Sequence, residues 1–239
     1  MKTKIDVLVV GGNGGIGSAL VQAFLEQGEQ FFVHGTWCHN RPHFHHDRLS
    51  WHNVDIADEA SIEALAGKFG KLDYLINAVG VLHNDEGQPE KSISQFNPDF
   101  FLMNARVNAM PSLLLAKHFQ RALKAAGKSV FAALSAKVGS VGGNRMGGWY
   151  SYRTSKAALN QALKTLSIEW HRTLPGCCVA TLHPGTADTA LSKPFQSGVS
   201  KDKLFTPQHS ATCLLEIITD LTPEQTGRFW AWDGSELPW

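Results

Sequence analysis

The chain has 239 residues, and its 22 Lys and Arg nearly balance its 21 Asp and Glu. This length can bury a substantial core, and a net charge near zero gives no electrostatic reason to expect a nucleic-acid partner. The cysteines show no C-x-x-C spacing, which favours free thiols in a reducing compartment. No apolar run approaches the length of a membrane span. We therefore expect a cytoplasmic protein without a membrane partner.

A glycine-rich turn follows the first apolar run. Residues 5–10 lead into Gly11-Gly12-Asn13-Gly14-Gly15-Ile16-Gly17, after which a segment containing alanine and leucine begins. This order predicts a buried strand, a turn and a helix. Glycines let a ligand approach the backbone, and the free N–H groups at a helix start suit a pyrophosphate. Gly11, Asn13, Gly15, Ile16 and Gly17 are therefore predicted to bind a dinucleotide, although an ordinary strand–helix turn would show a similar pattern.

Strands and helices then alternate along the chain. Strands are predicted at about 31–34, 51–56, 72–79, 130–134, 178–182 and 228–232, and helices at about 58–69, 98–125, 149–173 and 207–218. Apolar strands separated by helices indicate an α/β fold with one doubly wound, mostly parallel sheet and helices on both faces (Rossmann-type). No repeat or linker interrupts the pattern, so residues 1–239 are predicted to form a single domain.

Polar and turn residues gather where the predicted strands end. These are Asn13, Asp55, Asn77, Ser135 and the run Pro184-Gly185-Thr186. Each alone would be an ordinary turn or cap residue. Because ligands bind beyond the carboxyl ends of the strands in an open parallel sheet, their joint placement predicts a binding site at this edge.

Tyr152 and Lys156 stand at the head of the long predicted helix. They are four residues apart, so they share a helix face and lie close enough to interact. A phenol with a pKa of about 10 is a poor acid–base catalyst at neutral pH. A nearby ammonium favours the phenolate and lowers that pKa. The spacing therefore predicts a catalytic pair, with an amphipathic surface pair as the plainer alternative.

The loop after the second predicted strand favours NADP(H) over NAD(H). NAD enzymes commonly place a carboxylate there for the ribose 2′-hydroxyl, but nothing acidic occurs between Glu29 and Asp47. Thr36, His39 and Arg41 could instead donate hydrogen bonds to a 2′-phosphate.

Histidines and one cysteine crowd into the same region: His34, Cys38, His39, His43, His45, His46 and His52. Imidazole and thiolate are good metal ligands, but the spacing matches no standard zinc pattern. An irregular loop explains the crowding, so no metal site is predicted.

Several motifs occur in the order typical of the short-chain dehydrogenases/reductases, and the chain resembles this family over nearly its whole length. They are Gly11-x-x-x-Gly15-Ile16-Gly17, Asn77-Ala78-Val79-Gly80, Tyr152-x-x-x-Lys156 and Pro184-Gly185. Within the family, residues 183–195 and 227–239 are similar to the C-factor-like and sniffer-like carbonyl reductase subgroup.

The resemblance implies roles for individual residues. Tyr152 would exchange the proton with the substrate oxygen, and Lys156 would hold the nicotinamide ribose. Asn108 would maintain a proton-relay water, with Asn104, one turn earlier, as its competitor. The remaining cofactor contacts would come from Asn77, Ala78 and Gly80 on the adenosine side, Asp55 and Ile56 at the adenine, and Pro184, Gly185, Thr186 and Thr189 around the nicotinamide end.

The chain departs from the family pattern at three positions. Ala78 replaces a usual second asparagine. Val10 stands where a threonine usually stabilises the glycine turn, and Ala136 stands where a catalytic serine is expected, three residues before Gly139. Ser135 can replace that serine if the strand ends before it or bulges, because successive strand residues point to opposite faces. Ser140 is the alternative, and both serines could also merely cap turns.

The resemblance and the motifs together imply an NADP(H)-dependent oxidoreductase of carbonyl reductase type. A hydride would pass between nicotinamide and a small carbonyl or alcohol substrate, with Tyr152 as the general acid/base. The alternative is a nucleotide-binding regulatory or signalling protein on the same fold with little turnover, which Ala136 keeps open. A sugar-nucleotide epimerase ranks lower, because the chain after the sixth strand looks too short for its substrate domain.

A homodimer or larger assembly is also expected. The predicted helices 98–125 and 149–173 carry Leu113-Leu114-Leu115 and Ala157-Ala158-Leu159, which is more apolar surface than one sheet face needs. In the family that the chain resembles, these helices pair across subunits.

Overall fold

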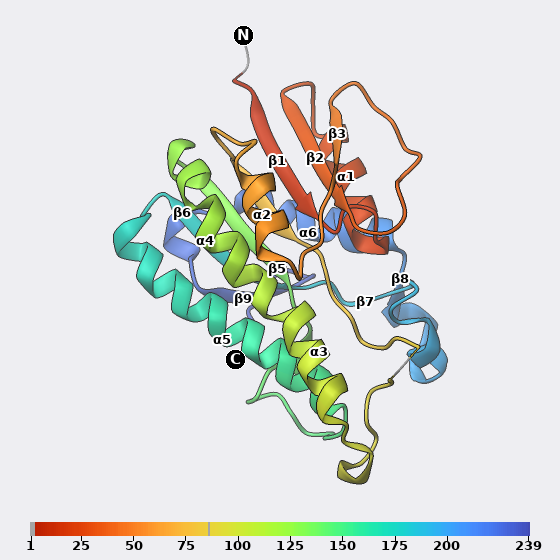
Figure 1. The fold of residues 1–239 in the computed structure, drawn as a ribbon. Helices are drawn as coiled ribbons and strands as arrows, with labels where there is room; N and C mark the ends of the chain where they lie inside the picture. Colours follow the sequence, from red (N-terminus) through yellow and green to blue (C-terminus); the bar gives the residue numbers. More distant parts are fainter. Residues whose placement is uncertain (1–2, 86) are drawn as a thin grey trace.

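A parallel seven-stranded sheet forms the centre of the computed structural model, which describes residues 3–85 and 87–239 (Figure 1). The strand order is β3-β2-β1-β4-β5-β6-β9, and every neighbouring pair is parallel. The strands are β1 (Ile5–Val10), β2 (Phe31–Trp37), β3 (Leu49–Asn53), β4 (Tyr74–Asn77), β5 (Ser129–Leu134), β6 (Cys177–His183) and β9 (Arg228–Ala231). The predicted doubly wound α/β fold is confirmed.

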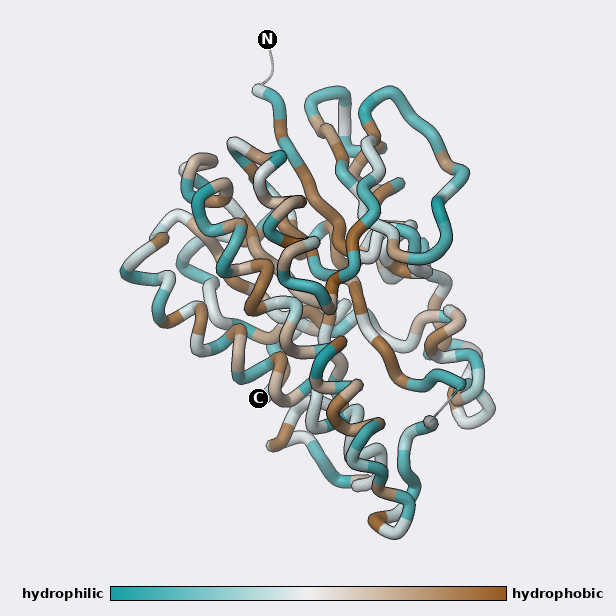
Figure 2. The backbone as a smooth tube through the Cα atoms, viewed as in Figure 1, coloured by the Kyte–Doolittle hydropathy of each residue, from teal (hydrophilic) through white to brown (hydrophobic). Residues whose placement is uncertain are grey.

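Helices cover both faces of the sheet. One face packs against α1 (Gly15–Glu26) and α6 (Pro207–Asp220), and the other against α2 (Glu59–Ala66), α4 (Met110–Ala125) and α5 (Tyr150–Thr173). A further helix, α3 (Pro98–Asn108), packs against α5 beyond the end of the sheet (Figure 1). The strands at the centre of Figure 2 are coloured brown, which marks hydrophobic residues. Their buried side chains belong to two separate cores, one on each face of the sheet.

The predicted helix over 98–125 is wrong in one respect, because it is two helices. α3 ends at Asn108, Ala109 has φ −111° and ψ −52°, and α4 starts at Met110. Pro111 explains the break, since its ring lacks an N–H and would clash with a carbonyl one turn earlier in a continuous helix. The break matters because it leaves Asn108 at a helix end, beside the carboxyl edge of the sheet.

Strand lengths also differ from the prediction. β2 continues to Trp37, whereas β3 ends at Asn53 and β4 at Asn77. Asp55 and Ile56 therefore lie in a loop rather than in a strand. The stretch predicted to be irregular after β6 contains a small parallel pair, β7 (Thr186–Ala187) with β8 (Leu204–Phe205), and 3-10 turns at Lys193–Gly198 and Lys201–Lys203.

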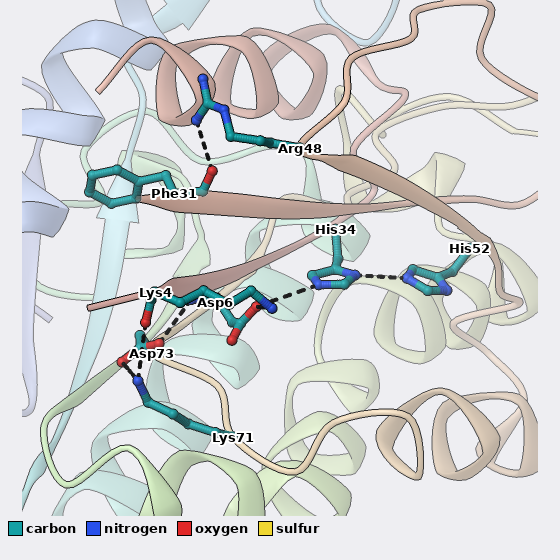
Figure 3. A network of polar contacts seen from close by, with 8 residues as sticks. All are labelled: Lys4, Asp6, Phe31, His34, Arg48, His52, Lys71 and Asp73. Carbon is teal, nitrogen blue, oxygen red and sulfur yellow. Dashed lines mark hydrogen bonds and ion pairs between the residues drawn. The ribbon is translucent and has the colours of Figure 1, made fainter. Parts of the chain in front are cut away.

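Two of the crowded histidines form a stacked pair on the neighbouring strands β2 and β3. His34 Nδ1 lies 3.1 Å from His52 Nε2, and the rings stack at 5.3 Å (Figure 3). His34 Nε2 lies 3.8 Å from Asp6 Oδ1, and that carboxylate also pairs with Lys4. Within residues 3–85 and 87–239, no three His, Cys, Asp or Glu side chains gather as a metal site would require.

The histidine pair should make the protein less stable in acid. Burial lowers the pKa of His34, and burial together with His34 and Lys68 lowers the pKa of His52 to about 4. Folding therefore favours the neutral rings. The stabilisation is complete above the unfolded pKa of about 6.5 and is lost as the pH falls towards 4. Because His52 is only half-buried, we expect a loss of about 1 kcal/mol from this pair.

Denaturant unfolding at pH 7.5 and pH 5.0 measures this effect. His52→Gln should reduce the difference in unfolding free energy between the two pH values. His171→Gln, an exposed histidine at the end of α5, is the matched control and should not change it. An equal pH dependence in wild type and His52→Gln would contradict the assignment.

Candidate active site

The glycine turn leaves the start of α1 open to a ligand. Gly11 has φ +77°, and a Cβ added at Gly17 would collide with the carbonyl oxygen of Gly11, so both positions require glycine. The N-cap residue is Gly14, which has no side chain to accept hydrogen bonds from the first turn of the helix. These N–H groups and the positive end of the helix dipole therefore suit a pyrophosphate.

Thr36 supplies the hydrogen bond that Val10 cannot make. The Gly11 N–H donates to Thr36 Oγ1 at 2.8 Å, so a residue of β2 stabilises the turn that leaves β1. Thr36 is buried, and its own hydroxyl proton is still able to donate to a ligand. Thr36 on the neighbouring strand therefore compensates for Val10, which stands where the family usually has threonine.

Three adjoining cavities run along the carboxyl edge of the sheet. One of about 230 Å³ lies between the glycine turn and β2, and one of about 410 Å³ lies over the start of α1. The third, of about 550 Å³, is the largest and is mostly apolar; we call it the substrate-side cavity. Tyr152 lines both larger cavities, so a ligand in one would meet a ligand in the other at its ring.

Most of the predicted cofactor residues line these cavities. They are Gly11, Asn13, Gly15, Ile16, Gly17, Thr36, Ile56, Ala78, Gly80, Lys156, Pro184, Gly185, Thr186 and Thr189. The edge of the sheet therefore brings together motifs that lie far apart in the sequence, as the position of the strand ends predicts.

Asn77 and Asp55 make other contacts instead. Asn77 is buried, and its Nδ2 donates to Ser112 Oγ at 2.9 Å, so it joins β4 to α4 rather than lining a cavity. Asp55 Oδ1 accepts from the Ala57 N–H at 2.9 Å and stabilises the turn before α2. Neither side chain lines the three cavities, and a direct contact of either with the cofactor stays a prediction.

His39 and Arg41 are exposed and lie outside the cavity lining. Their loop is nevertheless attached to the glycine turn, because Asn13 Nδ2 donates to the carbonyl of Asn40 at 3.1 Å. This contact holds the segment that carries both side chains at the rim of the smallest cavity.

Tyr152 and Lys156 meet at the junction of the two larger cavities. Tyr152 is 7% exposed, and the Lys156 ammonium lies 5.9 Å from the centre of its ring. Lys156 Nζ also donates to the carbonyl of Leu134 at 2.9 Å, which holds the lysine against the end of β5. The predicted pair therefore belongs to the site and is not a surface pair.

The expected direction of the Tyr152 pKa shift is wrong for this structure. Burial raises the pKa of Tyr152 above its usual value, and burial lowers the pKa of Lys156 to about 8. Removal from water opposes both charged forms, and it is the cause of both shifts. The phenol therefore holds its proton at neutral pH, which suits a proton donor.

Asn108 connects the site to the loop that follows β4. Its Oδ1 accepts from the Val81 N–H at 2.8 Å, and its Nδ2 donates to the Val81 carbonyl at 2.9 Å and to Ser155 Oγ at 2.9 Å. Asn104 accepts from Asn108 at 3.2 Å and donates to Phe100, so it lies behind Asn108. Of the two asparagines, Asn108 stands nearer the catalytic helix.

The two candidate serines differ in position. β5 ends at Leu134, and Ser135 lines both cavities that contain Tyr152. Its hydroxyl donates to Asn160 Oδ1 at 2.6 Å. Ser140 lies outside the lining, and its Oγ accepts from the Gly143 N–H at 2.9 Å in a turn.

Glu90 was not predicted, although it holds the start of the catalytic helix. It is 2% exposed; its Oε1 accepts from the Ser151 hydroxyl, and its Oε2 from the Ser151 N–H at 3.1 Å. The Trp149 N–H donates to the Glu90 carbonyl, and Trp149 adopts φ +53° as the N-cap of α5. A carboxylate at a helix N-terminus is stabilising, but Glu90 and Ser151 are 61 positions apart, so no local sequence pattern reveals this cap.

Comparison with known proteins agrees with this geometry. A family model described as short chain dehydrogenase matches residues 6–200. The chain is 33% identical over 192 residues to the 1-hydroxy-2-glutathionyl-2-methyl-3-butene dehydrogenase of Rhodococcus sp. (strain AD45), covering 78% of each protein. It is 32% identical over 133 residues to the C-signal of Myxococcus xanthus, covering 56% of this chain and 75% of that protein.

Solved structures show the same fold. The carbonyl reductase Sniffer of D. melanogaster matches with a TM-score of 0.86 at 24% identity, over 99% of this chain and 100% of that chain. The NADPH-bound carbonyl reductase from chicken fatty liver matches with a TM-score of 0.84 at 25% identity, with the same coverage. The chain therefore belongs to the short-chain dehydrogenase/reductase family and is an oxidoreductase of that family. The predicted similarity to C-factor-like and sniffer-like proteins is confirmed.

Proposed function

We propose that the protein is an NADP(H)-dependent carbonyl reductase. The observation that carries this proposal is the position of Tyr152, which lines both the cavity over the open start of α1 and the large apolar cavity beyond it. Lys156 lies beside it, buried and attached to the end of β5. Among the described residues Tyr152 is the only tyrosine that lines either cavity, so its phenolic proton donor stands where the two cavities meet.

The residues present fit a nicotinamide dinucleotide. A Cβ at Gly15 would collide with Thr189, and a Cβ at Gly17 with Gly11, so the backbone forms a narrow cradle at the uncapped helix start. Gly15, Ile16 and Gly17 would hold the pyrophosphate, and Lys156, Pro184 and Thr189 the nicotinamide half. The bound cofactor would supply the hydride for the carbonyl carbon.

The side chains of this chain would manage the proton. Tyr152 would give its phenolic proton to the carbonyl oxygen as negative charge develops there, and the raised pKa of Tyr152 keeps that proton available at neutral pH. Through its hydrogen bonds to Val81 and Ser155, Asn108 would hold the loop after β4 in place against α5. The mostly apolar substrate-side cavity would exclude water from the reacting atoms.

Steady-state oxidation of NADPH with a panel of aldehydes and ketones tests the proposal. Turnover that depends on Tyr152 supports it. Tight NADP(H) binding without turnover of any carbonyl compound would favour the second candidate, a nucleotide-binding regulatory protein. Ala136 is the observation that favours this second candidate, because it places a methyl group in the substrate-side cavity where the family usually has a hydroxyl.

NADP(H) should bind more tightly than NAD(H). Thr36 lines the smallest cavity, and His39 and Arg41 stand at its rim, so a 2′-phosphate would meet donors and one positive charge. The chicken carbonyl reductase was solved with NADPH bound. We expect a dissociation constant roughly tenfold lower for NADP(H), a size typical of one charge-assisted hydrogen bond.

Calorimetric titration with both cofactors measures this preference. Arg41→Ala should reduce the preference, whereas Arg172→Ala, an exposed arginine in the last turn of α5, should leave it unchanged. Equal or tighter NAD(H) binding by the wild type would contradict the prediction.

A homodimer stays our prediction for the assembly. Leu102 of α3, Leu113 of α4 and Ile168 of α5 are 62%, 47% and 61% exposed, so the outer surface of these helices carries apolar side chains. Light scattering at micromolar concentration should give twice the 26.2 kDa chain mass. Ile168→Lys should shift the equilibrium towards monomer, and a monomeric wild type would refute the prediction.

The single-domain organisation and the cytoplasmic location also remain proposals. Among residues 3–85 and 87–239, every helix is too short or too polar to cross a bilayer.

A further inference from the structure

One part of the substrate-side cavity is lined by aromatic side chains. The rings of Trp149 and Phe195 meet edge to face at 5.3 Å, and Trp149 meets Tyr152 in the same way at 6.2 Å. Leu191 and Val199 also line the cavity. Such a surface suits an aromatic or otherwise flat apolar group placed next to the Tyr152 hydroxyl.

The same cavity also carries positive charge and lacks a balancing acid among the described residues. Lys137, Arg145 and Arg153 line the cavity, whereas no Asp or Glu of the described residues does. None of the three cations forms an ion pair with another residue in the part of the chain that the structure describes. The net charge of the whole chain is only +1, so this concentration of positive charge is local to the cavity.

Arg153 is the best-anchored of these cations. Its Nε–H donates to the Gly148 carbonyl at 3.0 Å and its Nη1 to the Val138 carbonyl at 3.3 Å. Both partners are neutral, so they orient the guanidinium without compensating its charge. Arg153 is partly buried, and this burial lowers the pKa of its guanidinium. A partly buried guanidinium with unused N–H groups is well suited to a carboxylate.

We propose that the enzyme prefers flat apolar aldehydes or ketones that carry a carboxylate, with the carboxylate bound by Arg153. The apolar part would lie against Trp149 and Phe195, and the carbonyl would face Tyr152. Lys137 and Arg145 are exposed at the cavity mouth and would attract the anion before it binds. This inference rests on the proposed carbonyl reductase function.

Matched substrates test the preference. We would compare kcat/KM for 3- and 4-formylbenzoate with kcat/KM for the corresponding methyl esters, which keep the ring and the aldehyde but lose the charge. The acid-to-ester ratio should exceed roughly tenfold, the size of a charge-assisted hydrogen bond at a partly buried site. The ratio cancels any general loss of activity that a variant suffers.

Arg153→Gln should lower this ratio by roughly tenfold or more, because glutamine keeps a polar side chain but not the charge. Arg172→Gln, at the far end of the same helix, is the control and should keep the wild-type ratio. A wild-type ratio near one, or a ratio that Arg153→Gln leaves unchanged, would overturn the inference while leaving carbonyl reduction itself intact.

A binding measurement separates the inference from the proposed function. Calorimetry with the Tyr152→Phe variant and NADP⁺ would compare 4-(hydroxymethyl)benzoate with its methyl ester. If no aldehyde is reduced but the acid binds more tightly through Arg153, the anion site is supported and the proposed reaction fails. If the acid shows neither faster turnover nor tighter binding than the ester, the anion site is refuted.

Discussion

Tyr152→Phe should lower kcat for carbonyl reduction by roughly 10²–10⁴-fold, the usual contribution of general acid–base catalysis. The substitution removes only the phenolic oxygen. The ring would keep its edge-to-face contact with Trp149 at 6.2 Å and its place below the Lys156 ammonium. The loss should therefore appear in kcat, while the dissociation constant for NADP(H) changes little.

Tyr150→Phe is the matched control for this prediction. Tyr150 belongs to the same helix turn and loses the same oxygen, but it is 37% exposed and lies outside the cavities. Its variant should keep wild-type kcat. If Tyr152→Phe retains more than about a tenth of kcat, then another group donates the proton.

The pKa shifts give the pH dependence of the same step. The raised pKa of Tyr152 keeps the phenol protonated across the neutral range, so reduction should be nearly independent of pH below about 8. Lys156, with a pKa of about 8, loses its charge above that pH. The reverse reaction, alcohol oxidation, needs the phenolate and should instead accelerate as the pH rises.

The sequence predicts those parts of the site whose chemistry is local. The glycine turn and the Tyr152–Lys156 pair are each set by residues within one turn of backbone, and the structure places both at the carboxyl edge of the sheet. The helix caps Asp58, Asn97 and Thr206 are local in the same sense, because each side chain accepts from an N–H two or three residues ahead.

Contacts between distant segments were not predictable in this way. Thr36 replaces the hydrogen bond missing at Val10 from 25 residues away, and Glu90 caps α5 from another loop. The motif around Asn77 likewise gave no sign that its amide donates to Ser112, 35 residues further along the chain. Such contacts depend on which side chains the tertiary fold brings together, so the periodicity of the sequence does not predict them.

Ser135→Ala should lower kcat by roughly 10²–10³-fold, the typical loss for one donor to a developing oxyanion. The strand has ended at Leu134, so Ser135 is free of the alternation that would turn it away, and it lines the cavity with Tyr152. Ala136, at the position of the usual serine, offers no side-chain donor there. Ser140 is held in its turn by Gly143, so Ser140→Ala should change kcat little.

The orientation of the Asn160 amide decides whether Ser135 can donate. As the structure has it, the serine proton goes to Asn160 Oδ1, and Asn160 Nδ2 is buried with no partner among the described residues. A buried unsatisfied donor costs about 1–3 kcal/mol. Turning the amide by half a revolution would let Nδ2 donate to Ser135 Oγ and would release the serine proton towards a carbonyl oxygen.

Asn160→Asp therefore tests which of the two orientations the Asn160 amide has in the active enzyme. A carboxylate only accepts, so it would hold the Ser135 proton permanently, and this variant should lose nearly as much kcat as Ser135→Ala. The double variant should then lose little more than either single variant, because both remove the same donor. If Ser135→Ala keeps full activity, the serine has no part in the reaction, and Tyr152 polarises the carbonyl without it.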